Sequence, residues 1–420
     1  MLAKEHNSVT KYAVNILDKW KQEIIAPEVN NLINEYCTYP DSYFDVNNGG
    51  HKKASRYYFE TDGIQFHYIP DTQIIDKYRY WNVNDGKLFA GGESENLNWK
   101  HAKNGFTYYL SRAVEFIKKN KLKDALAYTG CLLHMLQDSC FGLHSLEGPY
   151  GTDLFVLDRL FEYGDDISEL PSNILVQEMP ESAVICPEYV PLLLGNTIEE
   201  AVFMLYSRYV ECCLKSRKIS FKIVLNHYER KSNKDLYTEM FHGIVELSAD
   251  VINTILHIAH DKKEHLSNVL LSELEPIDRP WGLGFYRFVT LLKNKALNYE
   301  KKLVPLKLIV KNSEMKFKKG MSFGSHSEFK FIYDLPENTY EKFTCYIGIQ
   351  TEFLNEGNVR IKFINNGNIV FDEIFNKENP SSKVLINNPK KYFEIIGSSP
   401  ENTRLKTVIT LGNPQFIHLE

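Results

Sequence analysis

Long apolar runs are missing from this sequence of 420 residues. No stretch of roughly 18 or more uncharged apolar residues occurs, so no transmembrane helix is predicted. A strong charge of one sign is also missing: the formal net charge of -5 gives no electrostatic argument for nucleic acid or an anionic membrane as a partner, and only a local basic patch would reverse that. With 43% hydrophobic and 25% charged residues, the composition is that of a soluble globular protein.

A disulfide framework is missing as well. The seven cysteines are an odd number without framework spacing, and Cys212 and Cys213 are adjacent, which favours reduced thiols. The first residues contain no apolar run long enough for a secretory signal. The sequence as written therefore predicts a cytoplasmic protein, or a secreted or surface-associated one if the start is truncated or export is non-standard.

The length exceeds what one hydrophobic core usually supports, which predicts two domains. Residues 1–265 have mainly helical periodicity, and the composition changes after Pro276 and Pro280. Residues 303–420 alternate β-branched or aromatic residues with polar ones, as in FKFIYDL and VRIKFIN. We therefore predict a multidomain α and β protein: an all-α domain over 1–265, a linker or helical junction over 266–302, and an antiparallel β-sandwich over 303–420.

Within the first domain, the apolar spacing predicts helices separated by a long irregular segment over 38–99 that is rich in Tyr, Asp, Asn and Gly. A loop of that length with many aromatics favours a functional role. The predicted helices cover one or two in 8–36, then 102–118, the stretch from 124, 153–162, 197–217 and 236–260.

The stretch Asp124–His144 holds the strongest chemical signal. His134 and Asp138 are four residues apart on an apolar helix, so they lie on one face, and His144 follows six residues later. An imidazole and a carboxylate that converge, with another imidazole just beyond the helix, are typical zinc ligands. A histidine and aspartate at this spacing are also common as a satisfied buried pair, so further ligands decide between the two interpretations.

Further candidate ligands precede that helix. His6 stands ahead of the first predicted helix, Asp41 lies in the turn sequence TYPD, and His67 lies in FHYIPD. His51, beside two lysines, is a candidate substitute for His67.

In order and spacing, these residues resemble the zinc-dependent phospholipase C family, the alpha-toxin-like lecithinases, whose helical fold is shared with single-strand nucleases. The resemblance covers most of residues 6–144. It rests on a histidine before a helix, an aspartate in a YPD turn, a histidine before an aromatic and Pro-Asp segment, and His-x3-Asp-x5-His on a central helix, matched by His6, Asp41, His67, His134, Asp138 and His144.

The resemblance implies two or three zinc ions. His67, His134 and Asp138 would share one ion, His6 and Asp41 would hold or bridge others, and His144 would take part in a second site. Asp41 would double as the general base. Clustered zinc polarises a phosphoryl oxygen and lowers the pKa of a bound water, which is the chemistry of phosphodiester hydrolysis.

The sequence departs from the family at two sets of metal ligands. The family has an amino-terminal tryptophan that binds metal, and this chain has Met1–Glu5 before His6. The family also has a His-x3-Glu pair on the helix after the central one, where this chain offers Asp153 instead. A true His-x3-Glu occurs downstream at His242 and Glu246, and both replacements stay open.

The end of the chain resembles a carbohydrate-binding β-sandwich module appended to bacterial glycosidases, over about residues 315–420. Gly324, His326, Ser327 and Glu328 before Tyr333-Asp334-Leu335, and the Asn366-Gly367-Asn368 turn, carry this resemblance. It implies the fold, and glycan binding as a possible partner interaction.

Together these observations predict an enzyme, a zinc-dependent hydrolase that cleaves a phospholipid head group in the manner of phospholipase C. Two alternatives stay open: a single-strand nuclease of the same fold, for which the sequence has no clear nucleic-acid signal, and a degenerate protein that binds metal or glycan without turnover.

Overall fold

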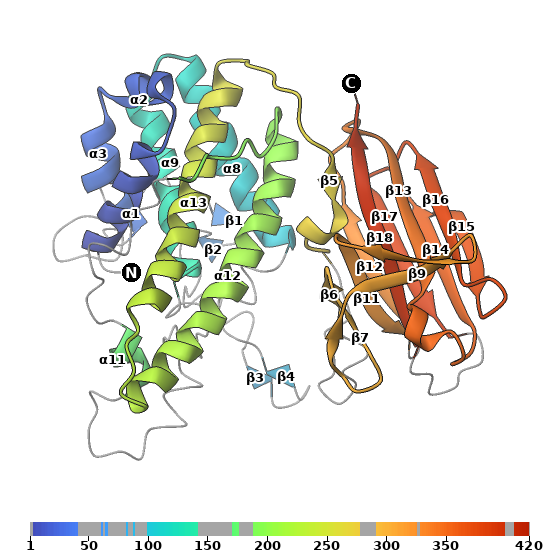
Figure 1. Cartoon of the computed structure of the whole chain (residues 1–420). Coiled ribbons are helices and arrows are strands. Elements are labelled where there is room, and N and C mark those ends of the chain that lie inside the picture. Colours follow the sequence, from blue (N-terminus) through green and yellow to red (C-terminus); the bar gives the residue numbers. More distant parts are fainter. Residues whose placement is uncertain are drawn as a thin grey trace. The chain divides into compact units, whose positions relative to one another are not determined.

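A computed structural model of the chain describes residues 3–40, 99–141, 170–175, 188–277, 291–325, 328–399 and 407–419, together with four short strands between 60 and 88. The chain divides into two compact units, Met1–Glu264 and His265–Glu420. Each unit is described by itself (Figure 1).

The first unit is helical. Among its described residues, no helix is both long and apolar enough to cross a bilayer. Its elements are α1 (Ala3–Asn15), α2 (Lys19–Ile25), α3 (Val29–Asn34), the 3-10 helix η1 (Tyr36–Thr38), β1 (Glu60–Thr61), β2 (Ile64–Gln65), β3 (Trp81–Asn82), β4 (Lys87–Leu88), α8 (Trp99–Lys118), α9 (Leu122–Ser139), α11 (Pro171–Leu175), α12 (Ile198–Tyr228) and α13 (Lys234–Ala259).

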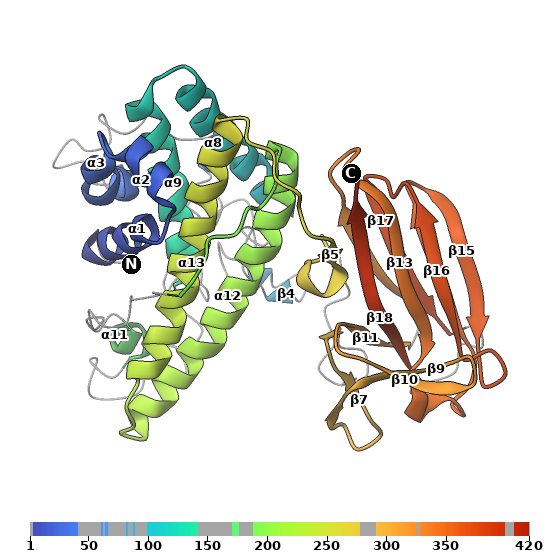
Figure 2. The same cartoon turned by 45° about the horizontal axis from the view of Figure 1, so that its top comes forward.

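Helix α9 is the centre of this unit. Fourteen of its 18 residues are buried, because it packs against α8, α13 and η1. Both views place α1 beside α13 and α13 beside α12 (Figures 1 and 2). A helix buried on nearly every side has few polar positions, so its polar residues demand a partner.

Helix α12 begins at a capping box, in which the Thr197 hydroxyl accepts from the Glu200 backbone N–H and the Glu200 side chain returns to the Thr197 backbone N–H. The helix ends at Tyr228, beyond the predicted end at Arg217. Two buried serines, Ser216 and Ser220, occupy its inward face where an apolar residue is expected, which hides the helical period in the sequence.

The second unit is built from antiparallel strands. Its elements are β5 (Val269–Leu270), η7 (Leu271–Glu273), β6 (Leu292–Lys293), β7 (Ala296–Leu297), β8 (Leu303–Val304), β9 (Leu306–Val310), β10 (Ser313–Phe317), β11 (Gly320–Ser325), β12 (Glu328–Asp334), β13 (Tyr340–Ile349), η9 (Thr351–Phe353), β14 (Val359–Asn365), β15 (Asn368–Phe375), β16 (Ser381–Asn387), β17 (Tyr392–Ser398) and β18 (Thr407–His418). One sheet has the order β16-β13-β18-β11-β6, with β5 beside β18, and another has the order β12-β17-β14-β15.

Aromatic residues join these two sheets. The ring of Phe343 on β13 lies 4.9 Å from that of Phe393 on β17, and the ring of Phe323 on β11 lies 4.8 Å from that of Phe331 on β12. Alternate residues of β14 and β17 are buried, as expected for strands with one face on a core. The predicted fold class, a helical domain followed by an antiparallel β-sandwich, is confirmed.

The expected linker over 266–302 needs correction. Strand β5 pairs with β18, and β6 pairs with β11, so parts of this range belong to the six-stranded sheet. Short two-residue strands carry too little periodicity to be recognised in a sequence.

Candidate metal centre

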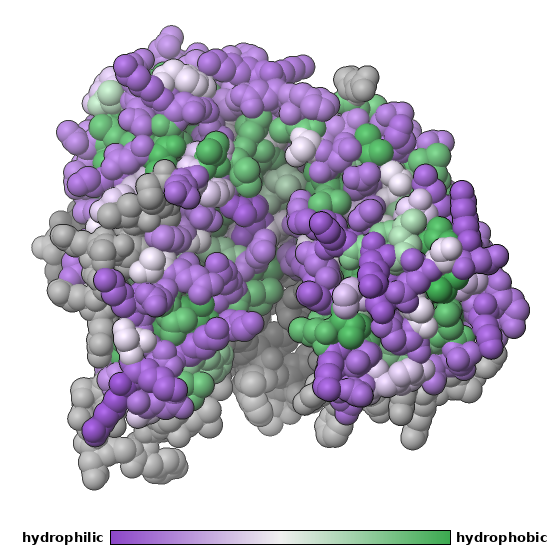
Figure 3. Space-filling model, viewed as in Figure 1, coloured by the Kyte–Doolittle hydropathy of each residue, from purple (hydrophilic) through white to green (hydrophobic). Residues whose placement is uncertain are grey.

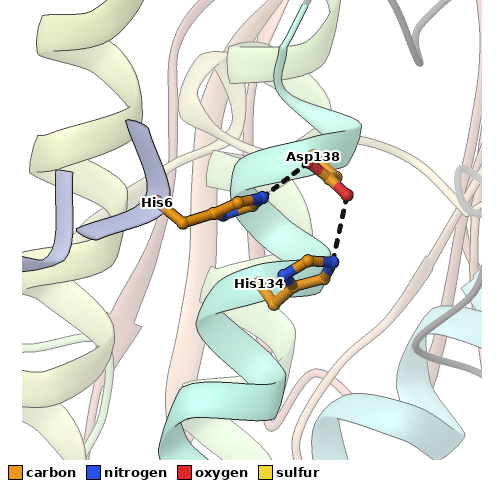
Figure 4. Close-up of side chains that lie close together, drawn as sticks. All are labelled: His6, His134 and Asp138. Carbon is orange, nitrogen blue, oxygen red and sulfur yellow. Dashed lines mark ion pairs between the residues drawn. The ribbon is translucent and has the colours of Figure 1, made fainter. Parts of the chain in front are cut away.

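Two helices bring three predicted ligands together. His6 projects from α1, and His134 and Asp138 project from α9 (Figure 4). Nε2 of His6 lies 3.1 Å from Oδ1 of Asp138, and Nε2 of His134 lies 3.1 Å from Oδ2 of the same carboxylate. The two imidazole rings stack with centroids 4.2 Å apart. Both histidines are buried, whereas 21% of the Asp138 side chain is exposed.

The hydrogen bonds around His6 fix its tautomer. The Ser248 hydroxyl donates to the Ile244 carbonyl, so its oxygen acts as the acceptor for Gln137 Nε2 at 3.3 Å. Gln137 Oε1 must then face His6 Nδ1, at 2.8 Å. An amide oxygen only accepts, so Nδ1 of His6 carries the proton and donates it.

The tautomer of His134 is fixed in the same way. Its Nδ1 lies 2.8 Å from the backbone carbonyl of Cys37, at the end of α3 and η1, and a carbonyl only accepts. Nδ1 of His134 is therefore the donor. In both rings the Nδ1 proton is bound elsewhere, as is usual for histidines that bind a metal through Nε2.

With Nδ1 the donor in each ring, a neutral imidazole at either position directs its Nε2 lone pair at the Asp138 carboxylate. Lone pairs and a negative charge repel one another unless a cation lies among them. Among the described residues, no group forms a hydrogen bond of good geometry with the buried Nε2 of His6. The residues thus fit a metal ion: a ligand atom from each lies within 4.8 Å of the others, and two nitrogens with one carboxylate oxygen are zinc ligands.

Burial affects the protonation of His6. Desolvation, and then the neighbouring His134, lower its pKa below the ordinary value of 6.5, against the opposing effect of Asp138. His6 is therefore neutral near pH 7, as metal binding requires.

This shift gives a prediction for the metal-free protein. Because the folded state resists protonation of His6, the unfolded chain binds more protons below about pH 6.5. We expect the free energy of unfolding to fall as the pH drops from about 6.5 towards the lowered folded pKa, and this group to contribute no slope above about 6.5. Urea denaturation between about pH 8 and about pH 5 measures the slope, and His6→Gln should reduce it. An unchanged slope in that variant would contradict the assignment.

The expected position of His6 needs correction. It lies within the first turn of α1 rather than ahead of the first helix, since nothing between Ala3 and Val9 breaks the helix. Its side chain lies beside His134 and Asp138, the pair with which the family resemblance groups His67. Asp41, His51, His67, His144 and Asp153 lie outside the described residues, so their roles stay predictions.

His242 and Glu246 lie on α13 and do not join the three ligands. The described part of the chain holds no other group of three His, Cys, Asp or Glu side chains close enough to share an ion. Whether this pair replaces Asp153 stays open.

Sequence reasoning missed the residues that orient the ligands. Gln137 is fully buried beside Asp138 and also donates to the Thr10 hydroxyl at 3.1 Å. A glutamine on the apolar side of a buried helix was the available signal. The Cys37 carbonyl left no signal, because a backbone group looks the same at every residue.

Gln137 gives the second prediction. Replacing it by Leu keeps the volume but leaves Nδ1 of His6 without an acceptor, so the ring loses its orientation. We expect zinc affinity to fall about 10- to 100-fold, the range for groups that orient metal ligands. Competition with a chromophoric zinc chelator measures this affinity. Gln137→Glu keeps the acceptor for Nδ1 of His6, so its loss of zinc affinity should be smaller. Equal zinc affinity in the Leu variant and the natural protein would show that Gln137 does not orient His6 for the metal.

No protein-family model and no curated protein sequence matches the chain. Solved structures do match. Alpha-toxin from an avian strain of Clostridium perfringens aligns over 97% of this chain and 86% of its own, with 10% identity and a TM-score of 0.32. This match extends over nearly the whole chain.

The second unit accounts for other matches. The M60 catalytic domain of C. perfringens ZmpB with its CBM51 domains aligns over 36% of this chain, with 18% identity and a TM-score of 0.32, and the alignment spans 15% of that protein. The CBM51 module of a C. perfringens GH95 protein, in complex with methyl-galactose, aligns over 36% of this chain and 99% of its own, with 15% identity and a TM-score of 0.30. The two families that the sequence resembles are thus both among the matched structures. At these identities and scores the matches carry no argument about activity, which rests on the side chains.

Proposed function

We propose that the helical unit is a zinc-dependent phosphodiester hydrolase of the phospholipase C type, acting on a phospholipid head group. The observation that supports this most is the convergence of the Nε2 atoms of His6 and His134 on the largely buried Asp138 carboxylate, with both Nδ1 protons bound by Gln137 and Cys37. A zinc ion bound there would polarise a phosphoryl oxygen and lower the pKa of a bound water.

The chain's own residues have distinct parts in this proposal. His6 and His134 are neutral ligands held rigidly by buried hydrogen bonds. Asp138 supplies the negative charge that balances a cation, and it is the most exposed of the three side chains. We further propose that Asp41 is the general base, that His67 binds the same zinc ion as His134 and Asp138, and that His144 and Asp153 bind one or two further zinc ions.

Glycan binding by the second unit is the second candidate. Tyr340 and Phe353 belong to the core of this unit, since they are 3% and 0% exposed, and offer no face to a sugar. Tyr299 and Tyr392, each 46% exposed, are the better candidates for stacking on a sugar ring. Calorimetric titration of the purified protein with galactose and with N-acetylglucosamine tests the binding. Absence of binding heat in both titrations would contradict the glycan-binding proposal.

The experiment for the enzymatic proposal has two stages. Metal analysis of the purified protein comes first, and absence of zinc and of any other bound transition metal would overturn it. The second stage compares phosphocholine release from phosphatidylcholine with cleavage of single-stranded DNA, each with and without a chelator. Chelator-sensitive phosphocholine release supports the proposal, DNA cleavage would replace it with the nuclease, and metal without either activity would favour the non-catalytic alternative.

A further inference from the structure

The end of α12 exposes an apolar stripe. Phe221, Leu225 and Tyr228 are 40%, 58% and 38% exposed. Their spacing of four and three residues places them on one face of the helix. Single apolar side chains on a protein surface are ordinary. Three exposed apolar side chains on one face of a helix, within eight residues, indicate an interaction site.

The same region is strongly basic. From Lys215 to Lys234 the sequence has seven Lys or Arg and one Glu, a local balance of +6 in a chain whose net charge is -5. Lys218 and Lys222 are exposed on the helix face that carries Leu225. No carboxylate in the described ranges forms an ion pair with either lysine. We call Lys218, Phe221, Lys222, Leu225, Tyr228 and Arg230 the hairpin surface, since they border the turn between α12 and α13.

Within the helical unit, the metal centre lies level with the middle of α13, where the Ser248 hydroxyl accepts from Gln137, and the hairpin surface lies at the turn where α13 begins. Three residues after Asp138, the ring of Phe141 packs 5.7 Å from that of Phe241 on α13. Phe241 is eight residues from the turn at Asn233, a distance of about 12 Å along a helix. Figure 3 shows hydrophobic side chains next to strongly hydrophilic ones along the lower part of this hairpin.

We propose that the hairpin surface docks the helical unit on an anionic phospholipid surface. Aliphatic and aromatic residues flanked by lysines are the composition of helices that lie in the head-group region, where apolar side chains enter the interface and lysines contact phosphates. A lipid fits better than single-stranded nucleic acid. The rings of Phe221 and Tyr228 are seven residues, about 10 Å, apart along the helix, whereas stacked bases repeat about every 3.4 Å. Leu225, which lies between them, has no aromatic face on which a base could stack.

The docking surface explains how a soluble hydrolase would reach a substrate that is part of a bilayer, and in that respect it rests on the proposed function. Binding itself needs neither zinc nor turnover. The Asp138→Asn variant should therefore bind vesicles as the natural protein does, which separates failure of docking from failure of hydrolysis.

The test is co-sedimentation of the full chain with vesicles of pure phosphatidylcholine and of phosphatidylcholine with about 30% phosphatidylserine. We expect binding to the anionic vesicles that weakens with salt. Lys218→Gln/Lys222→Gln should reduce the partition coefficient about 30-fold, taking about 1 kcal/mol per lysine. Phe221→Ser/Leu225→Ser should reduce it about tenfold.

Matched controls use exposed residues of the same unit. Val190→Ser, at a side chain 75% exposed, and Lys11→Gln/Lys19→Gln should leave the partition coefficient unchanged. All these positions are at the surface, so circular dichroism should show folded variants. Equal binding to both vesicle types, or equal losses in the control variants, would overturn the proposal. Salt-sensitive binding of single-stranded DNA that survives Leu225→Ser, without vesicle binding, would assign the surface to nucleic acid instead.

Discussion

Asp138→Asn is expected to remove the metal while leaving the helical unit folded. The substitution keeps the shape of the side chain but removes its charge. We expect zinc affinity to fall more than 100-fold, since even groups that only orient a ligand contribute 10- to 100-fold, and hydrolysis to be lost with it. A calorimetric zinc titration and measurement of zinc content give the result.

The same substitution should not destabilise the metal-free protein. The carboxylate faces the Nε2 lone pair of neutral His6 there, and the amide nitrogen of Asn can donate to it, so the free energy of unfolding should stay equal or rise. Urea denaturation in a chelator measures it. Zinc bound at the natural affinity by this variant would show that the ligands lie elsewhere.

Asp250→Asn is the matched control. The Asp250 carboxylate is fully buried and accepts hydrogen bonds from Arg208, Tyr189 and the Leu192 backbone N–H. Burial raises the pKa of this group to about 6, with Arg208 opposing the shift. Removing the charge leaves the part-buried Arg208 guanidinium, 28% exposed, with a neutral partner, so stability should fall by about 1–3 kcal/mol while zinc affinity is kept. The two variants thus separate loss of metal from loss of stability.

Much of the fold followed from periodicity. The alternation in VRIKFIN and FKFIYDL gave the strands because each has one face on an aromatic core, and the apolar spacing gave α8, α9 and α13. The end of α12 was missed because Ser216 and Ser220 are buried there, and Ser220 donates to the Ser216 carbonyl instead of to water. A buried polar residue that bonds to its own helix looks like an exposed one in the sequence.

The candidate site was predictable in part, for a similar reason. His134 and Asp138 lie on one helix, so their spacing determines their proximity. His6 joins them only through the packing of α1 beside α9, which no local spacing encodes. The orientation of both rings depends on Gln137, Ser248 and a backbone carbonyl, and such contacts become visible only when the chain is folded.

Gly130→Ala is expected to damage the metal centre from a distance, because η1 approaches α9 at this glycine. A Cβ on Gly130 would lie 2.5 Å from the carbonyl carbon of Tyr36 and 2.6 Å from its oxygen. These are backbone atoms of a buried residue, so η1 must move as a whole. Cys37 follows Tyr36, and its carbonyl accepts the Nδ1 proton of His134 at 2.8 Å.

The alanine has two opposing effects on stability. Higher helix propensity contributes about 1 kcal/mol, and overpacking against backbone costs about 1–3 kcal/mol, so the net change should be destabilising. Zinc affinity should fall about 10- to 100-fold as the Cys37 carbonyl leaves His134. Gly243→Ala on α13 is the control, since its Cβ would meet only the Cys212 sulfur at 3.5 Å, and it should stabilise the protein with zinc affinity unchanged. If Gly130→Ala instead binds zinc as tightly as the Gly243 variant does, the Cys37 carbonyl has no part in holding His134 for the metal, and the close approach of η1 serves packing alone.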